Sequence, residues 1–305
     1  MDYTIGDAPH FVSAYGITFH SFAKINSQLY EVYLFTSEVR GMQKVRIIVP
    51  PAYATSGNST YYPVLYLLHG AYGNADTWTT FAPGQIACGN ESLITVMPNG
   101  DSFGFYTNWV NPGNDAPQNW RTYHMEQLVP WIDLNFRTVA KKQGRALIGF
   151  SMGGFGAIRY AQQYPHNFAY TVGLSCPLDM RDTHIQQTLY NFPFDGKPLV
   201  GPFGIPSQPI ASNGWYAQDP ITHAATLRDV NVALYAGDGD SLEILLRDST
   251  IRMRNTLVSL NISVYFDDFG NGQFVGHGCT GKHDGTCMVG LLIKVLPRVM
   301  AVLKQ

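Results

Sequence analysis

Three short runs of the chain are mostly apolar, and they limit the fold more than any other feature of the sequence. They read YPVLYLL, SLITVM and RALIGF and cover residues 62–68, 92–97 and 145–150. A near-continuous apolar run is typical of a strand buried on both faces, as in a parallel sheet covered by helices on each side. Helical patterns at 123–136 and 152–163 alternate with these runs, which predicts a mostly parallel, doubly wound α/β sheet.

Further strands and helices are expected on both sides of this central part. The stretches 30–36 and 44–49 are rich in the β-branched and aromatic residues that favour strands. The remaining expected elements are strands at 168–174, 230–236 and 262–266 and helices at 242–260 and 290–303. Because 45% of the 305 residues are hydrophobic, the chain can fill one large core, and we expect residues 1–305 to form a single domain.

Residues 177–220 break the alternation of strands and helices. Prolines stand there among glycines and aromatic residues, at Pro193, Pro198, Pro202, Pro206 and Pro209. Long irregular stretches in a compact domain are often lids or binding loops. We expect either a lid-like insertion over the functional site or a passive excursion on the surface.

Charge and hydropathy exclude several classes of protein. The formal net charge is −2, so we expect no nucleic-acid partner. No apolar stretch approaches the ~20 residues that cross a membrane, and residues 1–20 have neither the basic start nor the apolar core of a secretory leader. Few charges and many aromatic residues favour an extracellular or cell-envelope protein, with the cytoplasm as the alternative.

The four cysteines fall into two kinds. Cys88 and Cys176 stand beside apolar runs, which favours buried free thiols. Cys279 and Cys287 lie eight residues apart in a glycine-rich stretch, where a disulfide and two free thiols are both open. No spacing is typical of a zinc site, and we expect no bound metal.

The pentapeptide GFSMG at residues 149–153 places Ser151 between an expected strand and an expected helix. A G-x-S-x-G turn in this setting is typical of a nucleophile elbow, in which glycines permit a strained turn that exposes the serine. The helix N-terminus behind the serine favours developing negative charge. We therefore predict an α/β-hydrolase fold with Ser151 as the attacking nucleophile.

The serine needs a base, and in this fold the acid and the base both follow the serine along the chain. The base is expected in the loop between the last strand and the last helix, which contains His277 and His283. His283 is preferred because it lies closer to the closing helix, and His277 is the alternative. His69, at the end of the first apolar run, is expected to support the loop beside it.

The acid is expected after the strand at 230–236, where residues 237–243 read GDGDSLE. Asp240 stands at a common depth for the acid in such folds, and Glu243 stands deeper, at the start of a helix; both remain candidates. One of them would orient the imidazole and stabilise its protonated form. The spacing of a calcium loop is incomplete, so we expect neither a metal nor another cofactor here.

Two backbone N–H groups are expected to bind the oxyanion of the tetrahedral intermediate. One belongs to Met152, the residue after the nucleophile, and the other to the loop after the first apolar run. That loop reads HGAYG and offers Ala71, with Tyr72 as its neighbour.

Several motifs together resemble the esterase D branch of the α/β-hydrolases, and within it the antigen 85-type mycolyltransferases and related esterases. They are YLLHGAYGNADTW, FYTNW, EQLVPWIDLNF, LIGFSMGG followed by YPHNF, LSCPLD and GDGDSLE, and they extend from about Tyr62 to the C-terminus. The resemblance implies a glutamate acid in a G-x-G-x-x-x-E pattern, which places Glu243 ahead of Asp240. It also implies His283 as the base and Ala71 as an oxyanion donor.

The chain also departs from this family at positions that bind the sugar. Tyr72 stands where the mycolyltransferases carry an arginine that helps to bind trehalose, and Asp284 and Gly285 replace a Ser-Trp pair after the histidine. Trehalose and mycolate are therefore not implied as substrates. We expect Tyr72 and Trp109 to contact whatever substrate is bound.

Three functions follow from these observations. The first is a serine esterase that hydrolyses a small-molecule or lipid ester through an acyl-enzyme. The second is an acyltransferase that moves the acyl chain to a sugar or alcohol. The third, from another class, is a non-catalytic cell-surface binding protein, which the retained Ser151 and His283 disfavour.

Overall fold

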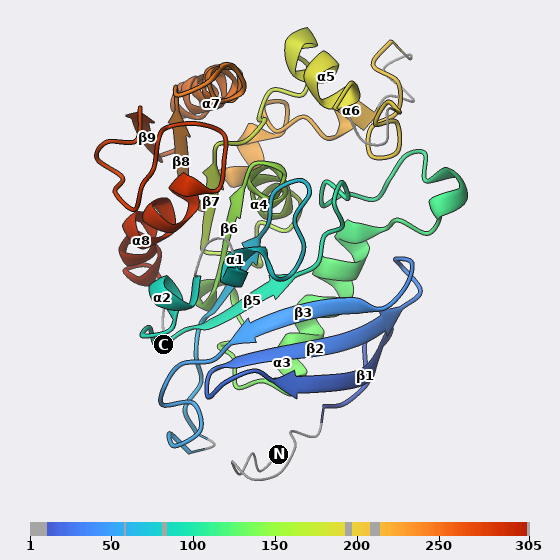
Figure 1. Cartoon of the computed structure of the whole chain (residues 1–305), viewed down its shortest axis with the longest axis vertical. Helices are drawn as coiled ribbons and strands as arrows, with labels where there is room; N and C mark the ends of the chain where they lie inside the picture. Colours follow the sequence, from blue (N-terminus) through green and yellow to red (C-terminus); the bar gives the residue numbers. More distant parts are fainter. Residues whose placement is uncertain (1–10, 58, 81–83, 193–196, 208–213, 304–305) are drawn as a thin grey trace.

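A nine-stranded mixed sheet runs through the chain (Figure 1). We describe the protein from a computed structural model, whose described residues are 11–57, 59–80, 84–192, 197–207 and 214–303. The strand order is β1-β2-β3-β5-β4-β6-β7-β8-β9. The strands are β1 Ile17–Lys24, β2 Leu29–Thr36, β3 Gln43–Ile48, β4 Val64–Leu68, β5 Ile94–Pro98, β6 Arg145–Phe150, β7 Tyr170–Leu174, β8 Asn231–Gly237 and β9 Val264–Gly270.

The sheet is parallel where the three apolar runs lie and antiparallel at its N-terminal edge. Parallel pairs join β5, β4, β6, β7, β8 and β9 in that order. Antiparallel pairs join β1 to β2, β2 to β3 and β3 to β5. Every residue of β4, β5, β6 and β7 is buried. The predicted fold class, an α/β sheet of mostly parallel strands, is confirmed.

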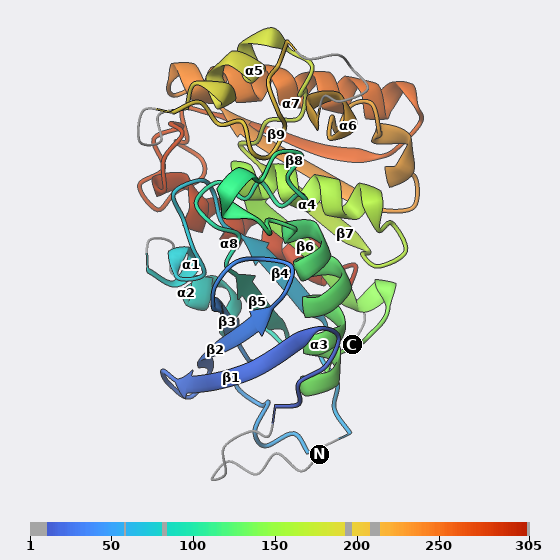
Figure 2. The same cartoon turned by 90° about the vertical axis from the view of Figure 1, so that its right-hand side faces the viewer.

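Helices cover both faces of the sheet. The α-helices are α1 Thr77–Thr80, α2 Gly84–Cys88, α3 Val129–Asn135, α4 Met152–Gln163, α5 Thr183–Tyr190, α6 Gly214–Ala217, α7 Ser241–Ser259 and α8 Thr286–Met300. One core contains apolar side chains of α3, α4 and α7, and a second core, on the opposite face, contains those of α1, α2 and α8. Figure 2 shows α3 and α4 in front of the sheet and α8 behind it.

The helix predicted at 123–136 has two parts. A π-helical turn, Thr122–Leu128, leads directly into α3, and Pro130 lies in the first turn of α3. Proline lacks an N–H group and is tolerated near a helix start, so the change of helix type at this point accommodates it without a break.

Some elements were not predicted from the sequence. Strand β1 extends the antiparallel edge, the last strand continues to Gly270, and α8 begins at Thr286, four residues before the expected start. The insertion 177–220 contains α5 and α6, while its residues 193–196 and 208–213 lie outside the described part of the chain. Helix α5 begins at the N-cap Asp182, whose carboxylate accepts the N–H groups of His184 and Ile185.

Candidate active site

Ser151 lies on a tight turn between β6 and α4, at the carboxyl edge of the parallel strands. Its backbone has a φ of 55° and a ψ of −120°, outside the regions that most residues adopt. A Cβ on Gly149 would lie 2.0 Å from the carbonyl oxygen of Gly153, and one on Gly153 would lie 2.3 Å from that of Leu68. The two glycines of the motif therefore permit the close packing of the turn, as the sequence predicts for an elbow.

His283 connects Ser151 to a carboxylate. The Ser151 hydroxyl lies 2.8 Å from Nε2 of His283, and Nδ1 of His283 lies 2.8 Å from Oε2 of Glu243. The imidazole stacks on the ring of Phe150, with 5.0 Å between centroids. Ser151, His283 and Glu243 come from three separate segments of the chain, and the structure brings them into one hydrogen-bonded row.

Glu243 lies in the first turn of α7, with a side chain that is fully buried. Its Oε1 accepts the N–H of Gly237 at 2.9 Å and the hydroxyl of Ser175 at 2.5 Å, so Oε2 is left to face the imidazole. A buried carboxylate is stable only where its oxygens are hydrogen-bonded. Ser175 is a site residue that the sequence reasoning missed, although it stands at the end of β7 within the LSCPLD motif.

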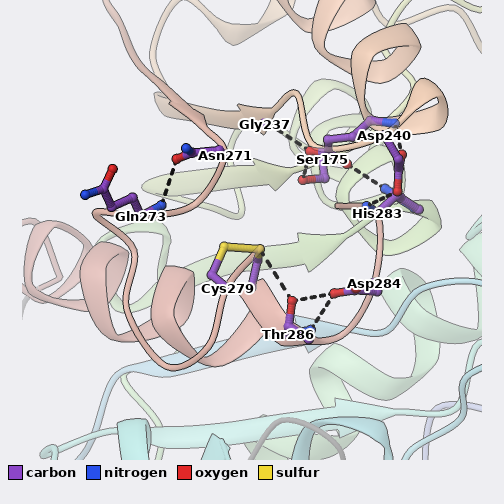
Figure 3. Close-up of a disulfide and its surroundings, with 11 residues drawn as sticks. Ser175, Gly237, Asp240, Asn271, Gln273, Cys279, His283, Asp284 and Thr286 are labelled. Atoms are coloured by element: carbon purple, nitrogen blue, oxygen red, sulfur yellow. Dashed lines mark hydrogen bonds and ion pairs between the residues drawn. A yellow bond between two sulfur atoms is a disulfide. The ribbon is translucent and has the colours of Figure 1, made fainter. Parts of the chain in front are cut away.

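The carboxylate of Asp240, the other candidate acid, contacts the backbone of His283. It is the N-cap of α7: Oδ1 accepts the N–H of Glu243 and Oδ2 accepts the N–H of His283, both at 2.8 Å (Figure 3). Desolvation raises the pKa of the Asp240 carboxyl, but these backbone N–H groups outweigh it and hold the pKa below its usual range. Of the two candidates, only Glu243 has a hydrogen bond to the imidazole.

A disulfide closes the loop that carries His283. Cys279 and Cys287 are bonded, with 4.2 Å between their Cα atoms, and Figure 3 shows the bridge beside Asp284 and Thr286. The Asp284 carboxylate accepts the N–H of Thr286 at 2.9 Å. Cys88 and Cys176 are free and buried, as predicted.

The alternative base, His277, is placed elsewhere on the same loop. It is exposed, has a φ of 53°, and stands between two glycines that also have positive φ. The residue paired with Ser151 is therefore His283, which lies closer to α8.

The two expected oxyanion donors lie next to Ser151. Met152 begins α4, where the first N–H groups of a helix have no acceptor within the helix, and both Met152 and Ala71 line the pocket that contains Ser151. The loop after β4 approaches the elbow closely, because a Cβ on Gly70 would lie 3.4 Å from the Cβ of Ser151.

His69 joins this loop to the neighbouring strand. Its Nε2 accepts the N–H of Gly100 at 2.9 Å, so Nδ1 carries the proton and donates to the Gly70 carbonyl at 2.8 Å. Complete burial lowers the pKa of His69 to about 4, so the ring is neutral at physiological pH. This is the supporting role that the sequence predicts for His69.

The predicted substrate contacts, Tyr72 and Trp109, lie in different places. A small apolar pocket adjoins Ser151 and His283, and the ring of Tyr72 lies 4.8 Å from that of Phe103, which lines this pocket. Trp109 lines a larger hollow of about 500 Å³ with both polar and apolar walls, which shares Phe103 with the small pocket. Among the residues that the structure describes, no cluster of three or more His, Cys, Asp or Glu side chains is placed to hold a metal, and no helix is long and apolar enough to cross a membrane.

Comparison with known proteins identifies the class to which this fold and this elbow belong. The Esterase family model matches residues 36–284, and the chain belongs to that family. It is 43% identical over 147 residues to esterase Rv1288 of Mycobacterium tuberculosis, a match that covers 48% of this chain and 32% of the relative. It is 28% identical over 202 residues to the diacylglycerol acyltransferase/mycolyltransferase Ag85B of Mycobacterium leprae, covering 63% of this chain and 59% of the relative. The chain therefore matches less than two thirds of either curated relative.

Solved structures share the fold over most of the chain. The chain superimposes on MPT51 of Mycobacterium tuberculosis with a TM-score of 0.69 at 18% identity, covering 88% of this chain and 97% of the other. The serine hydrolase FphF of Staphylococcus aureus gives a TM-score of 0.69 at 19% identity, with coverage of 89% and 97%. These similarities confirm the α/β-hydrolase fold and the resemblance that the motifs indicate.

Proposed function

We propose that this chain is a serine esterase that hydrolyses a carboxylic ester through an acyl-enzyme on Ser151. The observation that carries the proposal is the continuous row of hydrogen bonds from Ser151 through His283 to the buried Glu243. A nucleophile, a base and a group that orients the base are the parts that acyl transfer to a serine requires. Membership of the Esterase family supports the same conclusion.

In the first half of the reaction, His283 takes the hydroxyl proton of Ser151 as its oxygen attacks the ester carbonyl. The N–H groups of Ala71 and Met152 stabilise the resulting oxyanion. The tetrahedral intermediate collapses when His283 gives its proton to the leaving alkoxide. An alcohol departs, and the acyl group remains on Ser151.

In the second half, water replaces the alcohol. His283 removes a proton from the water as it attacks the acyl carbonyl, a second oxyanion forms, and its collapse returns the proton to Ser151 and releases the acid. Glu243 stabilises the imidazolium in both halves, because its negative charge faces Nδ1 in a water-poor setting.

Transfer to an alcohol is the second candidate function. It requires the same residues, with an alcohol in place of water in the second half, and the similarity to Ag85B favours it. An acceptor alcohol added to the assay would then accelerate release of 4-nitrophenol from a 4-nitrophenyl ester and yield a new ester, whereas for a strict hydrolase it would do neither.

The substitution Ser151→Ala tests the mechanism. We expect it to lower kcat for a 4-nitrophenyl ester by about a thousandfold or more, because the nucleophile is removed, while circular dichroism and Tm remain those of the wild type. Ser259→Ala, which alters an exposed serine at the end of α7, serves as the control. Near-normal turnover by a pure Ser151→Ala protein would exclude Ser151 as the nucleophile.

A further inference from the structure

The apolar pocket beside Ser151 is small. Its cavity volume is about 30 Å³. Its lining residues are Ala71, Phe103, Phe105, Ser151, Met152, Pro177, Leu189, Phe192, Leu242, Leu246 and His283. Most of these side chains are apolar and none carries a fixed charge, so the pocket suits a short hydrocarbon group attached to the carbonyl under attack.

The insertion supplies one wall of this pocket. Leu189 lies in the last turn of α5 with 8% of its surface exposed, and Phe192 follows just after the helix ends. The ring of Phe192 lies 5.4 Å from Tyr72 and 6.0 Å from Phe103, measured between centroids. A line of aromatic contacts therefore joins the insertion to the loop that carries Ala71.

Other parts of the lining are held by the core. The ring of Phe105 packs edge-on against Phe155 of α4 and against Phe203, and Leu246 of α7 has 2% of its surface exposed. Close-packed side chains of this kind do not give way without a cost in free energy. A longer acyl group would therefore need space on the side of the pocket that Leu189 and Phe192 form.

We propose that this chain takes short acyl groups, from acetyl to about butanoyl, and that Leu189 and Phe192 set this limit. The inference rests on the proposed function, since it assigns the pocket to the acyl part of the ester. With the carbonyl oxygen at Ala71 and Met152, the pocket faces the first carbons beyond the carbonyl, and its small volume of about 30 Å³ favours an acyl group with few of them. An octanoyl chain would collide with Phe192 and with the end of α5.

A series of 4-nitrophenyl esters from acetate to dodecanoate tests the limit. For the wild type we expect kcat/KM to be highest between acetate and butanoate and to be at least about tenfold lower for octanoate. Phe192→Ala and Leu189→Ala each remove part of the wall, and each should raise the ratio of kcat/KM for octanoate to that for butanoate by about tenfold. Phe274→Ala, at a side chain that is 85% exposed on another loop, should leave this ratio unchanged.

Binding without turnover separates this inference from the proposed function. Calorimetry with the Ser151→Ala protein is expected to show tighter binding of ethyl butanoate than of ethyl octanoate. In the Ser151→Ala, Phe192→Ala double variant, ethyl octanoate should bind more tightly than ethyl butanoate. Hydrophobic transfer alone favours the longer ester, so the preference for butanoate would come from the shape of the pocket. If neither ester were turned over by the wild type, the proposed function would fail while this measurement still decided the inference.

Two results would overturn the inference. One is a wild-type kcat/KM for the octanoate ester that equals that for the butanoate ester, or tighter binding of ethyl octanoate than of ethyl butanoate by the Ser151→Ala protein. The other is an unchanged chain-length ratio in both Phe192→Ala and Leu189→Ala, with Tm showing that both variants are folded.

Discussion

Asp240 and Glu243 stand three residues apart and hold the same histidine in different ways. Glu243 accepts a hydrogen bond from Nδ1–H of the imidazole, whereas Asp240 accepts hydrogen bonds from the backbone N–H groups of His283 and Glu243. Asp240 thus ties the start of α7 to the loop of the base. In our proposal, Glu243 stabilises the positive charge that develops on the imidazole during the reaction. Asp240 keeps the loop of His283 in place against the start of α7.

Substitution at these two positions should therefore have unequal effects on turnover. We expect Glu243→Gln to lower kcat by about 10³- to 10⁴-fold, because a neutral amide no longer stabilises the imidazolium. Asp240→Asn keeps the size of the side chain and one accepting oxygen, so kcat should fall only about tenfold. Steady-state kinetics on 4-nitrophenyl acetate measures both, and a larger loss in Asp240→Asn would make Asp240 the acid.

At the scale of elements, the loop between β9 and α8 must deliver His283 across the carboxyl edge of the sheet. Its backbone is anchored to Asp240 and to the start of α7, and the disulfide ties Cys279 to the first turn of α8. A Cβ on Gly239 would lie 2.4 Å from the carbonyl carbon of Gly281, so the loop also packs closely on the connection between β8 and α7. Disulfides persist in oxidising compartments, so this bridge would hold the loop most firmly there.

The disulfide should stabilise both the fold and the geometry of the base. Closing a loop of eight residues is worth about 2–3 kcal/mol through the entropy of the unfolded chain. We expect a Cys279→Ser, Cys287→Ser double variant to lose about that much free energy of unfolding in urea and to show a lower kcat. Reducing agent should reproduce both effects in the wild type and have no effect on the double variant. Equal stability of the two proteins in urea would contradict this expectation.

At the scale of the whole molecule, two buried histidines connect the layers. His124, in the π-helical turn before α3, lies 2.9 Å from the Tyr160 hydroxyl of α4 and 2.9 Å from the Asn99 carbonyl after β5. His69 bridges the ends of β4 and β5. Desolvation lowers the pKa of His124 to about 3 and that of His69 to about 4, so both are neutral in the folded protein.

Lowering the pH should therefore begin to destabilise the fold at pH values above those at which carboxylates titrate. Both pKa values lie below the 6.5 of a free histidine, so the unfolded chain binds more protons and stability is lost as pH falls from about 6.5 toward 4. The loss is on the order of 3 kcal/mol for each histidine.

Urea unfolding at pH 7, 6, 5 and 4.5 measures how the free energy of unfolding changes with pH. His124→Gln keeps a donor and an acceptor but cannot titrate, so its free energy of unfolding should fall less steeply than that of the wild type. Parallel curves for the two proteins would show that His124 does not contribute to the pH dependence.

Local patterns account for what could be predicted from the sequence. Apolar runs and helical spacing depend on neighbours in the chain, so the parallel strands, the elbow at Ser151 and the helix behind it could be located without coordinates. Strand β1 and the short helix α5 were missed: α5 has an N-cap signal at Asp182 but lies in a stretch rich in proline.

The sequence by itself determined the fold class and the family, and it was sufficient to propose Ser151, an acid and a histidine in that order along the chain. Tertiary structure decided which carboxylate faces the imidazole: Asp240, the N-cap of α7, binds the backbone of His283, whereas Glu243, in the first turn of α7, binds its ring. It also decided the size of the pocket, whose walls come from residues as far apart in the chain as Phe103, Phe192 and Leu246. Such distances depend on how the layers pack, and no local pattern records them.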